Sequence, residues 1–247
     1  MKPLLDVRGI SKSFGQLQIL KDLSFCVREG APTSIIGPNG AGKTTLFNVI
    51  TGRIPADKGS VFFGGSNVTA VKPHELSLMG VARSFQINNF FQNLTVWENL
   101  ALSVQSRHKQ RVSIWRSLNH SNGFKEKIEN ALNLIGMIDQ ADITASKLSY
   151  GDQRKLEIGL ALATEPKLLM LDEPTSGMSR YESLSMIDLI ERLSSKVTIM
   201  LIEHDIEFVM KVSENLVVIN LGEKIAEGTP KEIESNAEVQ RVYLGGL

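Results

Sequence analysis

The segment at residues 37–44 has the residue types and spacing of a phosphate-binding loop. Its sequence, Gly-Pro-Asn-Gly-Ala-Gly-Lys-Thr, matches the pattern G-x-x-x-x-G-K-[ST]. The glycines let successive backbone N–H groups point into one concavity, Lys43 can reach the outer phosphates of a nucleotide, and the Thr44 hydroxyl can bind Mg2+. The alternative is a glycine-rich turn that contains Lys-Thr by chance. Apolar residues precede this segment and a helix-forming stretch follows it, and that context favours a phosphate loop. The predicted nucleotide-binding residues of this loop are Gly37, Pro38, Asn39, Gly40, Ala41, Gly42, Lys43, Thr44 and Thr45.

Two carboxylates end the apolar run at residues 168–171. The carboxyl ends of strands in an open α/β sheet line the crevice that binds ligands, so both should face the phosphates. We expect Asp172 to hold Mg2+ through water and Glu173 to orient or deprotonate the water that attacks the γ-phosphate. An acidic turn that merely caps a buried strand is the alternative. Beside a phosphate loop, this pair predicts hydrolysis of a nucleoside triphosphate.

His204 follows another apolar run, residues 198–202, in the sequence Ile-Glu-His-Asp. Its position after a predicted strand is the same as that of Asp172. A histidine there can donate a hydrogen bond to a γ-phosphate oxygen or to the attacking water. From position alone, a polar side chain that simply satisfies a strand end remains the alternative.

The elements that must position these residues are predicted from hydrophobic patterning. Continuous apolar runs at residues 34–36, 168–171 and 198–202 are typical of parallel strands buried on both faces. Residues 90–163 instead show helical signals, including a capping box from Thr95 to Glu98. The polar residues 105–122 are expected to form a solvated loop. These patterns predict an α/β core with an inserted helical subdomain.

Composition narrows the possible partners. Lys+Arg and Asp+Glu both number 27, so the 247-residue chain lacks the broad charge that attracts nucleic acid, and no nucleic-acid partner is expected. The one cysteine, Cys26, cannot form an internal disulfide, which favours a reducing compartment. The longest apolar runs fall far short of the ~20 residues needed to span a bilayer. We therefore expect a chain that crosses no membrane.

The segment at residues 148–154, Leu-Ser-Tyr-Gly-Asp-Gln-Arg, resembles the Leu-Ser-Gly-Gly-Gln signature of ABC transporters. With it, the chain is similar to an ABC nucleotide-binding subunit from end to end. The resemblance implies that Gln86 binds Mg2+ and senses the γ-phosphate, that Phe14 stacks on adenine, and that His204 is the switch histidine. It also places the D-loop at residues 176–179. The implied cofactors are ATP and Mg2+.

The signature has two interpretations that hold together. Physically, Ser149 and Asp152 form a capping box for a helix predicted at residues 153–163. In the family, the same residues act in trans: two subunits pack head to tail, and the signature of one closes over the ATP held by Lys43 of the other. ATP then favours the closed dimer because only that state offers it the extra contacts. The residues assigned to this contact are Ser149, Tyr150, Gly151 and Asp152.

Departures from the family pattern indicate a subgroup. Tyr150 replaces the first signature glycine and Asp152 the glutamine, as in the branched-chain amino-acid importer group. Further similarities to that group lie at residues 80–86, 93–100, 150–158 and 242–245. The resemblance implies two transmembrane permease subunits, a second ATP-binding subunit and, indirectly, a solute-binding protein as partners. Ser179 replaces the aspartate that often ends the D-loop, which is compatible with a sister chain as the second subunit.

The resemblance thus implies a RecA-like phosphate-loop NTPase core with an N-terminal antiparallel β subdomain. We predict the core at residues 1–89 and 164–232, the helical subdomain at 90–163 and a tail at 233–247. The expected location is peripheral, on the cytoplasmic face of the inner (plasma) membrane. A urea-type importer, a lipopolysaccharide exporter, a non-transport ABC ATPase and a module that binds ATP without turnover remain alternatives, since nothing in a nucleotide site reads the cargo.

Overall fold

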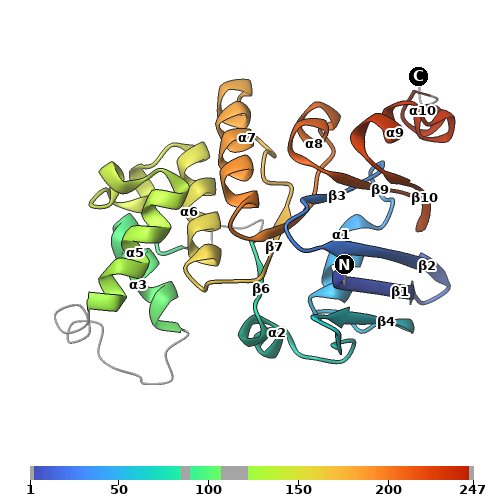
Figure 1. Cartoon of the computed structure of the whole chain (residues 1–247), viewed down its shortest axis with the longest axis horizontal. Helices are drawn as coiled ribbons and strands as arrows, with labels where there is room; N and C mark the ends of the chain where they lie inside the picture. The colour runs from blue at the N-terminus through green and yellow to red at the C-terminus, as the bar shows by residue number, and fades with distance from the viewer. Residues whose placement is uncertain (1–2, 85–89, 107–121, 245–247) are drawn as a thin grey trace.

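Two β-sheets and a set of covering helices make up the part of the chain that the computed structural model describes, residues 3–84, 90–106 and 122–244 (Figure 1). The smaller sheet has four antiparallel strands in the order β2-β1-β4-β5. Its strands are β1 (Pro3–Phe14), β2 (Leu17–Arg28), β4 (Lys58–Phe63) and β5 (Ser66–Asn67).

The larger sheet has six strands in the order β10-β9-β3-β8-β7-β6. Only β10 runs antiparallel to its neighbour, and the other five strands are parallel. The strands are β3 (Thr33–Ile36), β6 (Val81–Arg83), β7 (Leu168–Asp172), β8 (Thr198–Ile202), β9 (Asn215–Asn220) and β10 (Glu223–Gly228). The three apolar runs predicted as core strands are the adjacent strands β3, β8 and β7, and every residue in them is buried. Their carboxyl ends therefore meet at one edge of the sheet.

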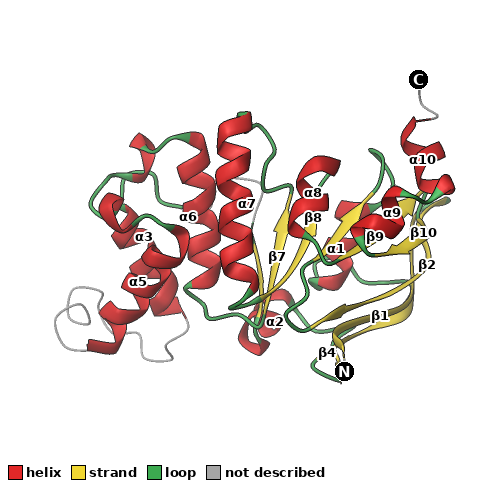
Figure 2. Cartoon of the chain, turned by 45° about the horizontal axis from the view of Figure 1, so that its top comes forward, coloured by secondary structure: helices red, strands yellow, loops and turns green. Residues whose placement is uncertain are grey.

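The larger sheet separates two hydrophobic cores because strand side chains alternate between its faces. Leu169 and Leu171 of β7 belong to a core shared with α7 (Arg180–Ser194) and α8 (Ile206–Val212). Leu168 and Met170 belong to the other core, shared with α1 (Lys43–Ile50) and the smaller sheet. Figure 2 shows this layering, with α7 and α8 on one side of the sheet.

A group of helices packs beside this core, at the left of Figure 1. It consists of α3 (Val96–Ser106), α5 (Asn122–Ile135) and α6 (Tyr150–Leu162), with short 3-10 turns at Ile138–Gln140 and Ala145–Lys147. The predicted capping box forms: the Thr95 N–H donates to Glu98 and the Glu98 N–H donates to the Thr95 hydroxyl. The predicted start of α6 at Gln153 is wrong, because the helix begins at Tyr150. The predicted domain boundaries stay a prediction, and most of the expected loop at 105–122 lies outside the described residues.

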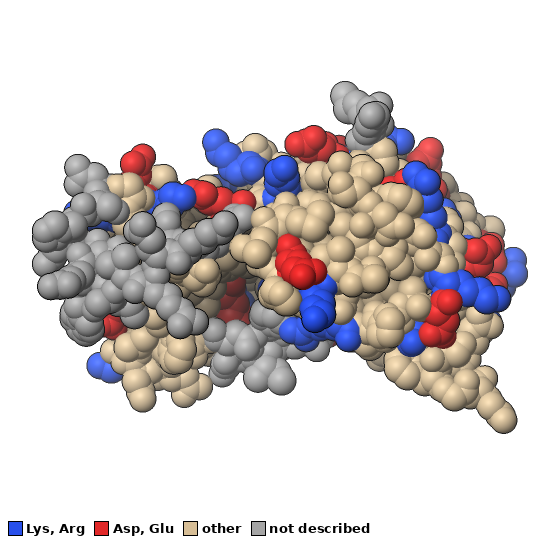
Figure 3. All heavy atoms as spheres, turned by 90° about the horizontal axis from the view of Figure 1, so that it is seen from below, with Lys and Arg blue, Asp and Glu red and all other residues tan. Residues whose placement is uncertain are grey.

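The remaining helices are α2 (Pro73–Met79), α9 (Pro230–Glu234) and α10 (Ala237–Leu244). In the described ranges, each helix is too short or too polar to cross a bilayer. Figure 3 views the molecule from below, where basic and acidic side chains lie side by side among the described residues. Arg8 and Asp6 form an ion pair of 2.6 Å at the surface.

Candidate active site

The phosphate-binding loop connects β3 to α1, as its sequence predicts. Gly42 caps the helix with φ = 103°, a left-handed conformation that glycine adopts without strain. At Gly37, a Cβ atom would lie 2.1 Å from the Ile219 carbonyl oxygen, so only glycine fits against β9. Within the loop, Asn39 and Gly40 are exposed, Pro38 is half-buried and Ala41 is buried. The glycines are therefore required by turn geometry and by close packing.

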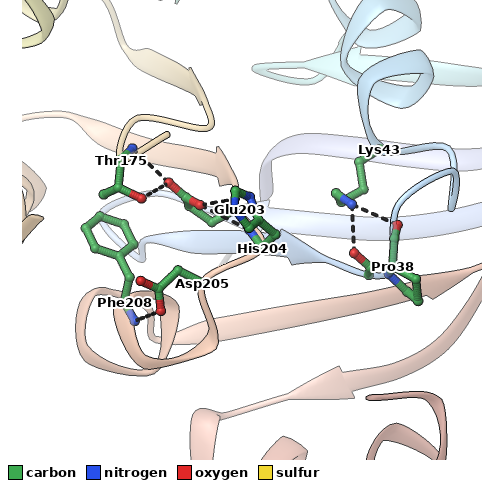
Figure 4. A network of polar contacts seen from close by, with 8 residues as sticks. Pro38, Lys43, Thr175, Glu203, His204, Asp205 and Phe208 are labelled. Carbon is green, nitrogen blue, oxygen red and sulfur yellow. Dashed lines mark hydrogen bonds and ion pairs between the residues drawn. The ribbon is translucent and has the colours of Figure 1, made fainter. Parts of the chain in front are cut away.

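Lys43 is buried at the start of α1 and reaches back into the loop (Figure 4). Its Nζ donates to the carbonyl oxygens of Gly37 at 2.7 Å and Pro38 at 2.9 Å. Burial lowers the pKa of its ammonium, while the nearby carboxylates of Glu173 and Asp172 act in the opposite direction. The loop thus holds a cation within electrostatic reach of both predicted acidic groups. The next residues of α1 are the exposed Thr44 and the half-buried Thr45.

Asp172 is the last residue of β7 and its side chain is almost completely buried. One carboxylate oxygen, Oδ2, accepts a hydrogen bond of 2.6 Å from Nη2 of Arg83. Among the described residues, the other oxygen, Oδ1, is buried with no hydrogen-bond partner. Burying a carboxylate oxygen without a partner is costly, and an Mg2+-bound water would supply a donor to it. The Thr44 hydroxyl and this carboxylate both supply oxygen atoms of the kind that hold Mg2+ in nucleotide sites.

Glu173 begins the turn after β7. Its φ is +48°, which is uncommon for any residue other than glycine, and its N–H donates to the Ile202 carbonyl at 2.9 Å. Such backbone strain is found at functional sites, where the surrounding structure over-determines the conformation. Here the bond to β8 fixes the turn that carries the proposed general base.

His204 follows β8, and its side chain is 56% exposed. Its backbone N–H donates to Oε2 of Glu203 at 3.0 Å. The completely buried Glu203 carboxylate also accepts hydrogen bonds from Thr175, at 2.9 Å from the N–H and 2.5 Å from the hydroxyl (Figure 4). Glu203 therefore links the turns that follow β7 and β8. Glu203 is not among the predicted site residues, although the sequence carries the same signal for it as for Asp172, an acidic side chain at the end of an apolar strand.

The signature residues lie at the start of α6, and half of the predicted capping box forms. The Ser149 hydroxyl accepts from the Asp152 N–H at 3.1 Å and donates to the Asp152 carboxylate at 2.9 Å, but the reciprocal bond from the Ser149 N–H to that carboxylate is absent. The Gly151 N–H donates to Oε1 of Glu182, on α7, at 3.0 Å. A side chain of the same chain thus occupies a donor that the resemblance assigns to ATP.

The D-loop, residues 176–179, contacts the signature within the same chain. The Tyr150 hydroxyl donates to the Ser176 carbonyl and accepts from Arg154, both at 3.0 Å. Ser179 caps α7, and Glu182 completes that capping box. Hydrogen bonds from the Ser179 hydroxyl and N–H, and from the Gly151 N–H, hold the pKa of Glu182 below its usual range.

The predicted site residues therefore fall into separate groups. Lys43, Asp172, Glu173 and His204 meet at the carboxyl edge of β3, β7 and β8. The start of α6 lies apart from α1 in Figures 1 and 2. Phe14 ends β1 with half of its surface exposed, and its ring centroid lies 5.5 Å from the Lys12 ammonium. Gln86 lies outside the described residues. The roles assigned to individual residues stay predictions.

Family models match two parts of the chain. A model described as "ABC transporter" matches residues 20–176, and one described as "Branched-chain amino acid ATP-binding cassette transporter" matches residues 223–246. The first includes the phosphate loop, the signature, Asp172 at the end of β7 and Glu173 in the turn that follows. The second covers β10, α9 and α10.

Individual relatives match over almost the whole length. The high-affinity branched-chain amino acid transport ATP-binding proteins LivG of Salmonella typhimurium and BraF of Pseudomonas aeruginosa are 38% and 37% identical, over 99% of this chain and 98% of their own. The crystal structure of the ADP conformation of MJ1267, an ATP-binding cassette of an ABC transporter, aligns with a TM-score of 0.86 at 32% identity, over 99% of this chain and 100% of that one.

These matches confirm the α/β fold with its phosphate-loop core, antiparallel β subdomain and inserted helices, and they confirm the resemblance to branched-chain amino-acid transport ATPases. A cassette of this kind binds and hydrolyses ATP, and the sheet edge around Lys43 and Asp172 has the residues for it. The chain belongs to the ABC transporter family, as one of its ATP-hydrolysing ATP-binding cassettes.

Proposed function

We propose that this cassette drives import of branched-chain or other hydrophobic amino acids through membrane proteins encoded elsewhere. The observation that carries the choice of cargo is the match of residues 223–246 to the branched-chain amino-acid cassette model. The almost full-length similarity to LivG and BraF supports it. The chain would sit peripherally on the cytoplasmic face of the inner membrane.

The nucleotide site would work through groups placed at one sheet edge. Lys43 would leave the Gly37 and Pro38 carbonyls to bind the outer phosphates, and Phe14 would stack on adenine. Thr44, Gln86 and, through water, Asp172 would hold Mg2+, which when bound neutralises phosphate charge. Oδ1 of Asp172, which is buried and has no hydrogen-bond partner among the described residues, supports this assignment.

Hydrolysis would depend on the two residues at the turns after β7 and β8. Glu173 would orient the attacking water and accept its proton, and His204 would donate a hydrogen bond to the γ-phosphate. Glu203 supports this pairing, since it ties the turn at Thr175 to the His204 backbone. As the water adds to the γ-phosphorus, the bond to the bridging oxygen would break, and ADP and phosphate would be the products.

The second subunit would be another ATP-binding cassette, identical or a sister chain. Its signature, at the positions of Ser149, Tyr150, Gly151 and Asp152, would close over ATP held at Lys43. In this chain the Gly151 N–H is bonded to Glu182, so closure would exchange that carboxylate for a phosphate oxygen. ATP would thereby favour the closed dimer, and hydrolysis would release it.

A cavity of about 280 Å3 between the core and the helical group suits a segment of a permease. Its walls come from α2, β6, α3, α6 and the residues that follow α1, and they include Leu76, Arg83, Ser103 and Glu157. Two permease subunits, fed by a solute-binding protein, would each receive one cassette.

A tagged Glu173→Gln protein, purified with ATP from detergent-extracted membranes of the native host, tests this proposal. Recovery of two permeases, a second ATPase and a solute-binding protein supports an amino-acid importer. Uptake of labelled leucine that falls on deletion of the gene, and returns with the wild-type chain, identifies the cargo. Recovery of lipid-export permeases, or uptake of urea as the activity lost, would overturn the cargo and favour the alternatives.

A further inference from the structure

Arg83 connects the buried Asp172 to the helix that follows the phosphate loop. Its Nη2 donates to Oδ2 of Asp172 at 2.6 Å, and its Nη1 donates to Oδ1 of Asn48 at 2.7 Å. A longer bond of 3.4 Å joins Nη1 to the Thr51 hydroxyl. The side chains of Arg83 and Asp172 are 9% and 1% exposed. Little of either side chain is exposed to water, and α1, β6 and β7 are joined by one guanidinium.

The bonding is asymmetric at the carboxylate. Arg83 takes one oxygen, and Oδ1 stays without a hydrogen-bond partner among the residues that the structure describes. A planar guanidinium fixed on its other side by Asn48 also fixes the rotation of the carboxylate that it binds. The carboxylate of Asp172 therefore cannot rotate to exchange its two oxygens, and Oδ1 keeps one direction.

We propose that Arg83 is a positioning residue for the metal site: it holds Asp172 so that Oδ1 is presented to Mg2+-bound water. The inference rests on the proposed nucleotide and magnesium site. Outer-shell partners of this kind orient ligands, and their loss typically costs 10- to 100-fold in metal affinity.

The position of Arg83 also connects the orientation of Asp172 to the proposed permease partner. Arg83 lines the 280 Å3 cavity in which a permease segment is proposed to sit, and it is the last residue of β6. A segment that enters the cavity would contact the wall formed by the same guanidinium that orients Asp172. Arg83 therefore takes part both in the wall of the cavity and in the alignment of the metal ligand Asp172.

The test measures metal binding without turnover. In a Glu173→Gln background, Mn2+ binding is followed by electron paramagnetic resonance with ATP present, and fluorescent trinitrophenyl-ATP binding is measured separately in EDTA. We expect Arg83→Met to weaken Mn2+ binding about tenfold and to leave metal-free nucleotide affinity within about twofold. Arg83→Lys restores the charge but not the planar fork, so it should recover part of the loss.

Charge alone predicts the opposite sign. Removing a cation beside Asp172 should tighten metal binding by Coulomb attraction, so unchanged or tighter Mn2+ binding in Arg83→Met would overturn the proposal. If that variant does not fold, Asn48→Ala decides, because it keeps Arg83 and removes its anchor. A loss of Mn2+ affinity in Asn48→Ala supports positioning, and wild-type Mn2+ affinity in that variant contradicts it.

A matched control is Arg8→Met, which breaks an exposed arginine–aspartate pair of the same 2.6 Å length. It should change neither measurement. Failure of the wild-type chain to bind trinitrophenyl-ATP at all would instead contradict the proposed nucleotide site. The two failures are therefore distinguishable.

Discussion

The backbone N–H of Gly151 donates to Oε1 of Glu182 at 3.0 Å, which ties the first turn of α6 to the first turn of α7. The other oxygen of Glu182 accepts from the N–H and hydroxyl of Ser179. The signature and the D-loop of one chain are thus joined through one carboxylate. Tyr150 adds a second link through its bond to the Ser176 carbonyl. Two departures from the family pattern, Tyr150 and Ser179, therefore lie at the same junction.

Tyr150→Phe should lower the free energy of unfolding by about 1 kcal/mol, because it removes the bonds to Ser176 and Arg154 but keeps the ring. ATP affinity of the single subunit should stay within about twofold. Urea denaturation measures the first quantity and nucleotide fluorescence the second. Tyr181→Phe, at an 82% exposed position on α7, is the control and should have little effect. Equal shifts in both variants would contradict the link.

Glu182→Gln should change how stability depends on pH. The pKa of Glu182 is lower in the folded chain than its ordinary value of 4.5, so its carboxylate stabilises the fold above that pH and loses this contribution as the pH falls through the folded pKa. The stability gap between wild type and Glu182→Gln should be constant near neutral pH and close as acid protonates Glu182. Urea midpoints across this range measure it. In a Ser179→Ala background, the stability difference caused by Glu182→Gln and its pH dependence should both become smaller. A stability difference that does not change with pH would contradict the assignment.

Glu203→Gln should destabilise the chain by about 2 kcal/mol, since an amide nitrogen would face donors at Thr175 or His204 in a fully buried site. It should also lower kcat more than it raises KM, because the turns after β7 and β8 lose their shared anchor. Steady-state ATPase kinetics and urea denaturation provide the two measurements. Glu234→Gln, at an exposed position, is the control. Wild-type stability of the Glu203→Gln protein would refute the anchoring role.

Lys43→Arg keeps the positive charge but should weaken ATP binding by at least about tenfold. The ammonium sits between two carbonyl oxygens at 2.7 and 2.9 Å, a space that a planar guanidinium on a longer stem does not fit. Fluorescent nucleotide titration measures the loss, with the exposed Lys58→Arg as control. Full affinity in Lys43→Arg would mean that charge, rather than the geometry of the loop, holds the phosphates.

Local patterns predicted the parts of the fold that depend on neighbouring residues. The phosphate loop, the buried strands β3, β7 and β8, and the Thr95–Glu98 capping box each depend on a few consecutive positions, and each formed as expected. The start of α6 was misplaced by three residues because Ser149 caps the helix directly, so that Tyr150 is already helical.

Long-range pairings could not be predicted from the sequence. Arg83 and Asp172 are 89 residues apart, Thr175 and Glu203 are 28 apart, and Tyr150 and Ser176 are 26 apart. Each pair meets only because neighbouring strands or helices bring it together. Spacing therefore indicated which residues could do chemistry, and the structure was needed to show which side chains hold them in place.

The most direct test of the account is phosphate release by the Glu173→Gln protein, at a concentration that allows cassettes to pair. A general base typically contributes ~10²- to 10⁴-fold, so the rate should fall by at least about a hundredfold while ATP affinity stays within about twofold. The wild-type chain and Glu234→Gln, measured alongside, should both hydrolyse ATP. Wild-type turnover in Glu173→Gln would contradict the assignment of the catalytic edge.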